Sequence, residues 1–310
     1  MGPSLFIPVS IVIFLVCTGS IIFFFFTKSK KIVTCNQQGL QYKDWEMWDD
    51  AIRCFQKALS LDNNHALSHY NLGFVLYFGK KQADEAIIEF ERAIELDMNM
   101  ASAHYALGHA QFHEKGLLDE ATKSLNRAIG LDPSLAQVHN TLGLIEIKKE
   151  DWGQALEHFR TAFSIDPTLE SACCNLSIAL VYQGKNTEAM EYAKKFVALN
   201  PRSTLAHNNL GNIYGSCGMK ARAIKQLQQS LSLDPDNWQV HFWLGCLRLQ
   251  LNECKKAVSS FQKVLHLYGD YALAYYNLAL CYEHDNNRAL AKKYIERAIE
   301  LNPVLGENLI

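Results

Sequence analysis

The sequence predicts an all-α protein, a solenoid of about eight helical hairpins preceded by one transmembrane helix. Three observations support this prediction. A small residue returns every 34 or 35 residues, an alanine follows it at a nearly constant distance in each repeat, and a long uncharged segment lies near the N-terminus. Self-similarity at a period of this length is the sequence signature of stacked helical repeats.

The repeat is marked by a small residue that follows an apolar position in the first predicted helix. It is usually glycine, and the eight positions are Gly39, Gly73, Gly108, Gly143, Ser177, Gly211, Gly245 and Ala279. Two of the steps between them are 35 residues long instead of 34. We place the extra residues in the turns between helices, at Lys80 to Gln82 and at Glu114 to Leu117, because loops tolerate insertions.

A second small residue, twelve or thirteen positions further on, is alanine in every repeat: Ala51, Ala86, Ala121, Ala155, Ala189, Ala223, Ala257 and Ala291. Two helices approach closely only where both carry small side chains, and a leucine there would cost roughly 1 to 3 kcal/mol. A large apolar residue such as Phe55 usually follows four positions later, which completes one helical stripe. Asp-Pro or Asn-Pro then ends the helix in five repeats.

These residues at this period resemble the tetratricopeptide repeat, and the resemblance covers about residues 32–303. Repeats 1, 2 and 7 depart from it at the proline position, where they carry Asn63, Met98 and Gly269. The resemblance implies a right-handed superhelix in which the first helix of each hairpin lines a concave groove. Residues 304–310 form a C-terminal tail that is shorter than the usual capping helix, so the uncapped C-terminal edge is a possible site of self-association.

Carried over position by position, the resemblance places a set of polar and aromatic residues in a peptide-binding groove: Tyr70, Asn71, Phe74, Tyr105, His109, Asn140, Asn175, Asn208, Asn209, Asn212, Phe242, Tyr276 and Asn277, with Trp243 beside Phe242. Asparagine occupies the sixth position of four repeats, where an amide can pair with the backbone of an extended peptide. This is similar to the asparagine ladder of the O-GlcNAc transferase superhelix. The alternative is that these residues follow the repeat consensus or pack between repeats.

Residues 5–26 are 22 consecutive residues without a charge. As a helix they would be about 33 Å long, enough to cross a hydrocarbon core of roughly 30 Å, so we predict a single-pass membrane anchor. Residues 27–31 form a basic juxtamembrane linker, and the positive-inside rule places the repeats in the cytoplasm. A cleaved signal peptide is the alternative, but the segment lacks a basic n-region and a small-residue cleavage site.

The sequence gives little support for a nucleic-acid, catalytic, cofactor or metal site. The net charge of −2 and the pI near 6.6 give no reason to expect a nucleic-acid partner. We predict no catalytic residue, no cofactor and no metal site, since phosphate-loop, nucleophile and Cys/His ligand motifs are missing. Histidine recurs at the fourth position of five repeats, and we interpret these as packing residues too far apart to share an ion: His69, His104, His139, His207 and His241.

We therefore predict a membrane-anchored scaffold, not an enzyme, that binds extended peptides or protein partners in the concave groove. Two alternatives remain open, a co-chaperone or import-receptor-like protein and the regulatory subunit of a membrane enzyme complex. Only Lys43 and Lys148 are basic at groove positions, which argues against a clamp for the terminal carboxylate of a chaperone tail.

Overall fold

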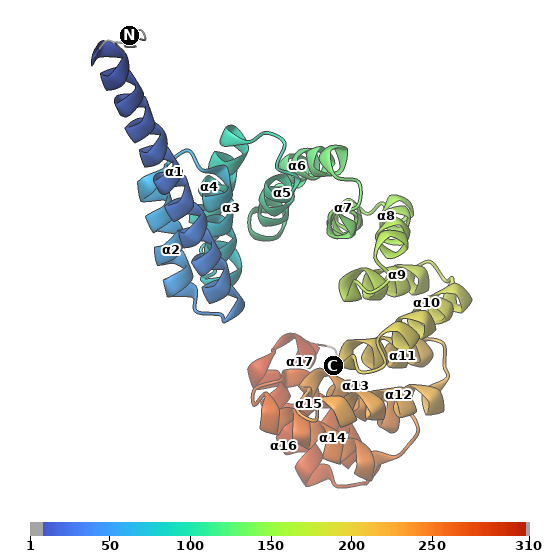
Figure 1. The fold of residues 1–310 in the computed structure, drawn as a ribbon. Coiled ribbons are helices and arrows are strands. Elements are labelled where there is room, and N and C mark those ends of the chain that lie inside the picture. Colours follow the sequence, from blue (N-terminus) through green and yellow to red (C-terminus); the bar gives the residue numbers. More distant parts are fainter. Residues whose placement is uncertain (1–8, 308–310) are drawn as a thin grey trace, which may run out of the picture. The chain divides into compact units, whose positions relative to one another are not determined.

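A computed structural model describes the backbone of residues 9–307 and the side chains of residues 27–306. In this described part all regular elements are helices, which follow one another as antiparallel pairs (Figure 1). The prediction of an all-α solenoid is confirmed. The chain divides into two compact units, Met1–Ile145 and Glu146–Ile310, which we call unit 1 and unit 2.

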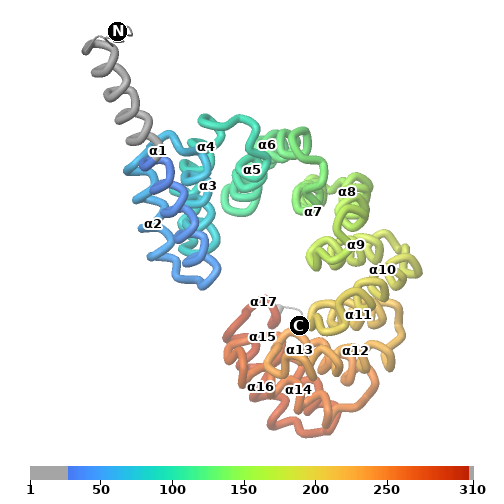
Figure 2. Tube along the Cα trace, in the orientation of Figure 1, coloured from blue at the N-terminus to red at the C-terminus, as the bar shows by residue number. Residues whose placement is uncertain are grey.

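The helices can be followed along the trace in Figure 2. Unit 1 holds α1 (Val9–Asp44), α2 (Trp48–Leu61), α3 (Ala66–Phe74), the π-helical turn η1 (Val75–Gly79), α4 (Ala83–Leu96), α5 (Ala101–Lys115), α6 (Leu118–Leu131) and most of α7 (Ala136–Lys148). Unit 2 continues with α8 (Trp152–Ile165), α9 (Glu170–Tyr182), α10 (Asn186–Leu199), α11 (Thr204–Ser216), α12 (Lys220–Leu233), α13 (Trp238–Leu249), α14 (Cys254–Leu267), α15 (Ala272–His284), α16 (Arg288–Leu301) and α17 (Val304–Glu307).

Each hairpin is closed where the small residue of its first helix meets the second helix. A methyl group added to Gly73 of α3 would lie 2.8 Å from the ring of Phe90 and 3.1 Å from the carbonyl oxygen of Ala86. Both partners, on α4, are fully buried. The alanine of this contact is likewise fully buried in the other repeats up to Ala257, whereas Ala291 of the last repeat is half-buried.

The two insertions lie in the first helices, not in the turns where we predicted them. In repeat 2 the end of the helix widens into η1, and the backbone N–H of Lys80 donates to the carbonyl of Val75 at 3.1 Å. A π-helical turn absorbs one extra residue without breaking the helix. In repeat 3, α5 has 15 residues where α7 has 13, because Glu114 and Lys115 are good helix formers and extend it.

The recurring histidines do more than the packing we predicted for them. In His69, His104, His207 and His241 the Nε2 atom lies 2.9–3.1 Å from the backbone carbonyl oxygen six residues earlier, which accepts a hydrogen bond from it. That carbonyl belongs to the turn between repeats. The histidine thus satisfies a turn carbonyl that the helices leave unpaired.

The two ends of the chain differ in part from the predictions. Residues 27–31, predicted as a linker, are helical within α1, because the lysines there favour a helix and no glycine or proline interrupts it. In the part of the chain with described side chains, no helix is long and apolar enough to cross a membrane. The predicted span, residues 5–26, lies outside that part. Of the predicted tail, residues 304–307 form the single turn α17.

Candidate functional site

The first helices of unit 1 carry a cluster of aromatic side chains on α3, η1 and α5, which we call the aromatic row: Tyr70, Phe74, Tyr77, Phe78, Tyr105, His109 and His113. Phe74 and Phe78 have ring centroids 4.5 Å apart, and those of His109 and His113 are 4.3 Å apart. Phe78 links the two pairs, with its ring 5.9 Å from that of His109. Four of the predicted site residues therefore lie together, but they pack mainly on one another.

Burial controls the charge of the aromatic row. It lowers the pKa of His109 to about 4, with a smaller contribution from His113, and the Nδ1 atom of His109 is buried with no hydrogen-bond partner among the described residues. Burial also lowers the pKa of His113. Both rings are therefore neutral at pH 7. The one nearby basic groove residue, Lys43, lies with its Nζ atom 5.1 Å from the centre of the Phe74 ring.

The predicted asparagines do not form a row of equivalent amides. Asn71 is buried and its Nδ2 atom donates to the Oδ1 atom of Asn36 at 3.4 Å. The Nδ2 atom of Asn277 donates at 2.7 Å to the carbonyl of Leu273 in the same helix. These two amides thus serve contacts within the chain.

The remaining predicted asparagines lie on α7, α9 and α11. Asn140 of α7 is buried, and Asn175 of α9 and Asn212 of α11 are half-buried. The Oδ1 atom of half-buried Asn208 on α11 lies inside the protein without a hydrogen-bond partner among the described residues. Asn212 of this group borders a pocket.

Asn209 of α11 is the exception among the sixth-position residues. Its side chain is 6% exposed, and neither amide atom has a hydrogen-bond partner of normal geometry among the described residues. Its polar neighbour is the thiol of Cys174 on α9. Burial raises the pKa of that thiol to about 11, against a smaller lowering by the Asn209 amide, so the thiol is uncharged. Leaving such an amide unpaired costs about 1 to 3 kcal/mol.

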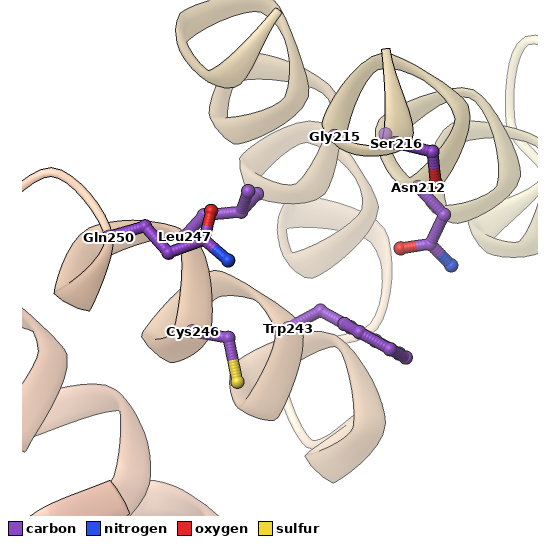
Figure 3. Close-up of a pocket in the computed structure, with 8 residues that line it drawn as sticks. Asn212, Gly215, Ser216, Trp243, Cys246, Leu247 and Gln250 are labelled. Carbon is purple, nitrogen blue, oxygen red and sulfur yellow. The ribbon is translucent and has the colours of Figure 1, made fainter. Parts of the chain in front are cut away.

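An open pocket of about 390 Å³ lies between α11 and α13 in unit 2 (Figure 3). It is lined by Gly211, Asn212, Gly215 and Ser216 from α11 and by Trp243, Cys246, Leu247 and Gln250 from α13 and its C-cap. None of these residues is charged at neutral pH, since burial raises the pKa of Cys246 to about 11. The volume falls within the range of small ligand sites.

Trp243 gives this pocket a large apolar surface. Its side chain is 49% exposed, and Figure 3 shows it on the α13 side of the opening with Asn212 on the α11 side. Phe242, its predicted neighbour, instead packs in the core with its ring 5.9 Å from that of Phe261. Tyr276 is half-buried on α15.

The sequence analysis selected asparagine and aromatic residues and therefore missed four residues that line the pocket: Gly215, Ser216, Cys246 and Gln250. Their positions in the repeat could have identified them. They occupy the ninth, twelfth and thirteenth positions of their repeats, which the family pattern also assigns to the groove.

The aromatic row predicts a pH-dependent stability. The folded-state pKa of His109, about 4, lies below the ordinary value of 6.5, so the unfolded chain binds more protons between these values. The stability is therefore complete above pH 6.5 and is lost as the pH falls toward 4. Between pH 7 and pH 5 the His109 contribution falls by about 2 kcal/mol. Urea unfolding at both pH values should show that His109→Phe loses less unfolding free energy between pH 7 and pH 5 than wild type does. Equal losses in the two proteins would contradict the lowered pKa of His109.

Comparisons with known proteins agree with the repeat pattern. A model described as TPR repeat matches residues 39–78, one described as tetratricopeptide repeat matches residues 66–99, 101–135, 170–203 and 272–304, and a further tetratricopeptide-repeat model matches residues 204–237. Outside these ranges the chain forms the helices α7 and α8 in residues 136–169 and the packed pair α13 and α14 in residues 238–271. A comparison with curated proteins gave no match.

Several solved structures share the fold. A tetratricopeptide repeat protein from Parabacteroides merdae is 15% identical, with a TM-score of 0.60, and the alignment covers 87% of this chain and 99% of that one. PilF of Pseudomonas aeruginosa is 22% identical, with a TM-score of 0.57, and the alignment covers 67% of this chain and 93% of PilF. The matching chain of the APC/C hetero-tetramer Cut9-Hcn1 is 17% identical, with a TM-score of 0.64, and the alignment covers 81% of this chain and 48% of that one. The repeat models together match more than half of the chain, which shows that it belongs to the tetratricopeptide-repeat family.

Proposed function

We propose that this protein is a membrane-anchored scaffold that binds an extended, uncharged segment of a protein partner on the first helices of unit 2. The observation that carries the proposal is the open pocket between α11 and α13, with the half-exposed Trp243 at its edge. Trp is enriched among the few residues that carry most of the binding energy of protein interfaces, once a partner buries it.

The chemistry of the pocket favours a neutral segment. Trp243 and Leu247 offer apolar surface to a branched or aromatic side chain, while the amides of Asn212 and Gln250 can pair with the peptide backbone. No basic side chain lines the pocket, so a terminal carboxylate or an acidic side chain would be desolvated without a partner. This favours the scaffold over a receptor for acidic chaperone tails.

Unit 1 is less suited to this role. The rings of its aromatic row are engaged with one another, and only Phe78 among them belongs to the exposed large apolar residues, at 37%. A partner side chain would have to displace these contacts before it could bind. We therefore assign peptide binding to unit 2 and a packing role to the aromatic row.

The membrane anchor in this proposal rests on the sequence. Residues 5–26 carry no charge, and Lys28, Lys30 and Lys31 follow directly. Such an anchor would hold the repeats beside a membrane surface and so raise the local concentration of any partner held in the same membrane.

The pocket predicts which substitutions weaken peptide binding. Peptides enriched from a random display library against the full-length chain should bind Trp243→Ala at least tenfold more weakly, because truncating an anchor that the peptide buries usually costs more than about 1.4 kcal/mol. Asn212→Ala should weaken binding less. Leu233→Ala, at an exposed position on α12, serves as the matched control and should bind normally. Enriched peptides that bind Trp243→Ala and wild type equally would contradict the pocket assignment.

The anchor makes a separate prediction. The full-length chain should remain with membranes during alkaline carbonate extraction, whereas a chain that begins at Thr27 should be released. Protease added to intact cells or vesicles should leave the repeats uncut when it cannot reach the cytoplasmic side. Extraction of the full-length chain by carbonate would rule out a spanning helix but would leave the peptide-binding proposal standing.

A further inference from the structure

Three side chains that commonly bind metal ions meet in unit 2, where α14 begins and α15 ends. The Sγ atom of Cys254, a ring nitrogen of His284 and a carboxylate oxygen of Asp285 all lie within 4.8 Å of one another. Cys254 is the first residue of α14, His284 is the last residue of α15, and Asp285 is the C-cap of α15. The two helices pack through a core that contains Cys254 and Cys281, which fixes this meeting point.

We propose that Cys254, His284 and Asp285 form a binding site for a divalent transition-metal ion of the zinc type. Zinc accepts thiolate, imidazole and carboxylate ligands together, usually in a tetrahedral arrangement. Three protein ligands leave the fourth position open to water. The thiolate and the carboxylate also supply two negative charges, which balance the charge of the ion.

The geometry requires only small movements. The Nδ1 atom of His284 and the Oδ1 atom of Asp285 are 4.0 Å apart. Bonds of about 2.0–2.1 Å at tetrahedral angles would place them roughly 3.3 Å apart, so the two side chains need to approach by less than about 1 Å. Both are exposed, at 54% and 42%, and can rotate toward the ion. Cys254 is 4% exposed, and its Sγ atom lies within 4.8 Å of the other two ligand atoms, so the exposed side chains need to approach it by little more than about 1 Å.

The helix ends add a favourable field. The N-terminus of α14 carries a partial positive charge that stabilises a thiolate at Cys254, and the C-terminus of α15 carries a partial negative charge that attracts a cation. Burial raises the pKa of the Cys254 thiol, so the free site holds a proton. Binding replaces the proton on sulfur with the metal ion and releases the proton to solvent.

A bound ion would connect the start of α14 to the end of α15 and so join repeats 7 and 8. Because the unfolded chain does not hold these three ligands together, binding would stabilise unit 2 by mass action. The ion therefore has a measurable effect on stability, and none of its three ligands lines the peptide pocket between α11 and α13.

Titration of the full-length chain with Co²⁺, a spectroscopic substitute for Zn²⁺, tests this site. Wild type should develop thiolate-to-cobalt charge-transfer absorption that saturates at one ion per chain and disappears when Zn²⁺ is added. Cys254→Ala should lose the absorption. Cys217→Ala, which removes another thiol of unit 2, should keep it and is the matched control.

Two exposed positions keep the test decisive if Cys254→Ala does not fold. His284→Ala and Asp285→Asn should each weaken Co²⁺ binding at least tenfold, and Zn²⁺ should raise the melting temperature of wild type more than theirs. No charge-transfer absorption in wild type, or unchanged affinity in both exposed variants, would overturn the proposal. Because the readout is metal binding, its failure would not affect the peptide-binding proposal.

Discussion

The close contact between a small residue on one helix and an alanine on the next is the constraint on which the rest of the structure depends. At Gly73 the two backbones are so near that there is no space for one more methyl group. This spacing buries Ala86 and Phe90 completely. Function can then vary along the first helices while the contacts that build each hairpin stay the same.

The helix pairs could be predicted from the sequence because their cause is local and periodic. The same pairing of glycine and alanine recurs in repeat after repeat, so one physical rule fixes many elements at once. The two inserted residues were assigned to the wrong elements. The 35-residue spacing shows that a repeat has one extra residue, but it does not show whether a helix or a turn accommodates that residue. A π-helical turn at Val75–Gly79 depends on packing around that helix end, which the repeat pattern does not encode.

The candidate site was less predictable because it depends on contacts between repeats. Asn71 and Asn209 occupy the same position of the pattern, yet Asn71 donates to Asn36, whereas Asn209 is buried without a hydrogen-bond partner in the described part of the chain. The pocket beside Asn212 is built from residues of two successive repeats, on α11 and α13. The cluster of Cys254, His284 and Asp285 was not predicted either, since Cys254 and His284 are far apart in the sequence and follow no ligand motif.

The most direct test of the account is the stability of two glycine-to-alanine variants in unit 1. Alanine favours a helix over glycine by up to about 1 kcal/mol at either position, but at Gly73 the added methyl group meets Phe90, whereas at Gly130 it meets open space. We predict that Gly73→Ala lowers the urea midpoint, since overpacking costs about 1 to 3 kcal/mol, and that Gly130→Ala raises it. A midpoint raised by both substitutions would show that close contact at small residues does not hold the hairpins together.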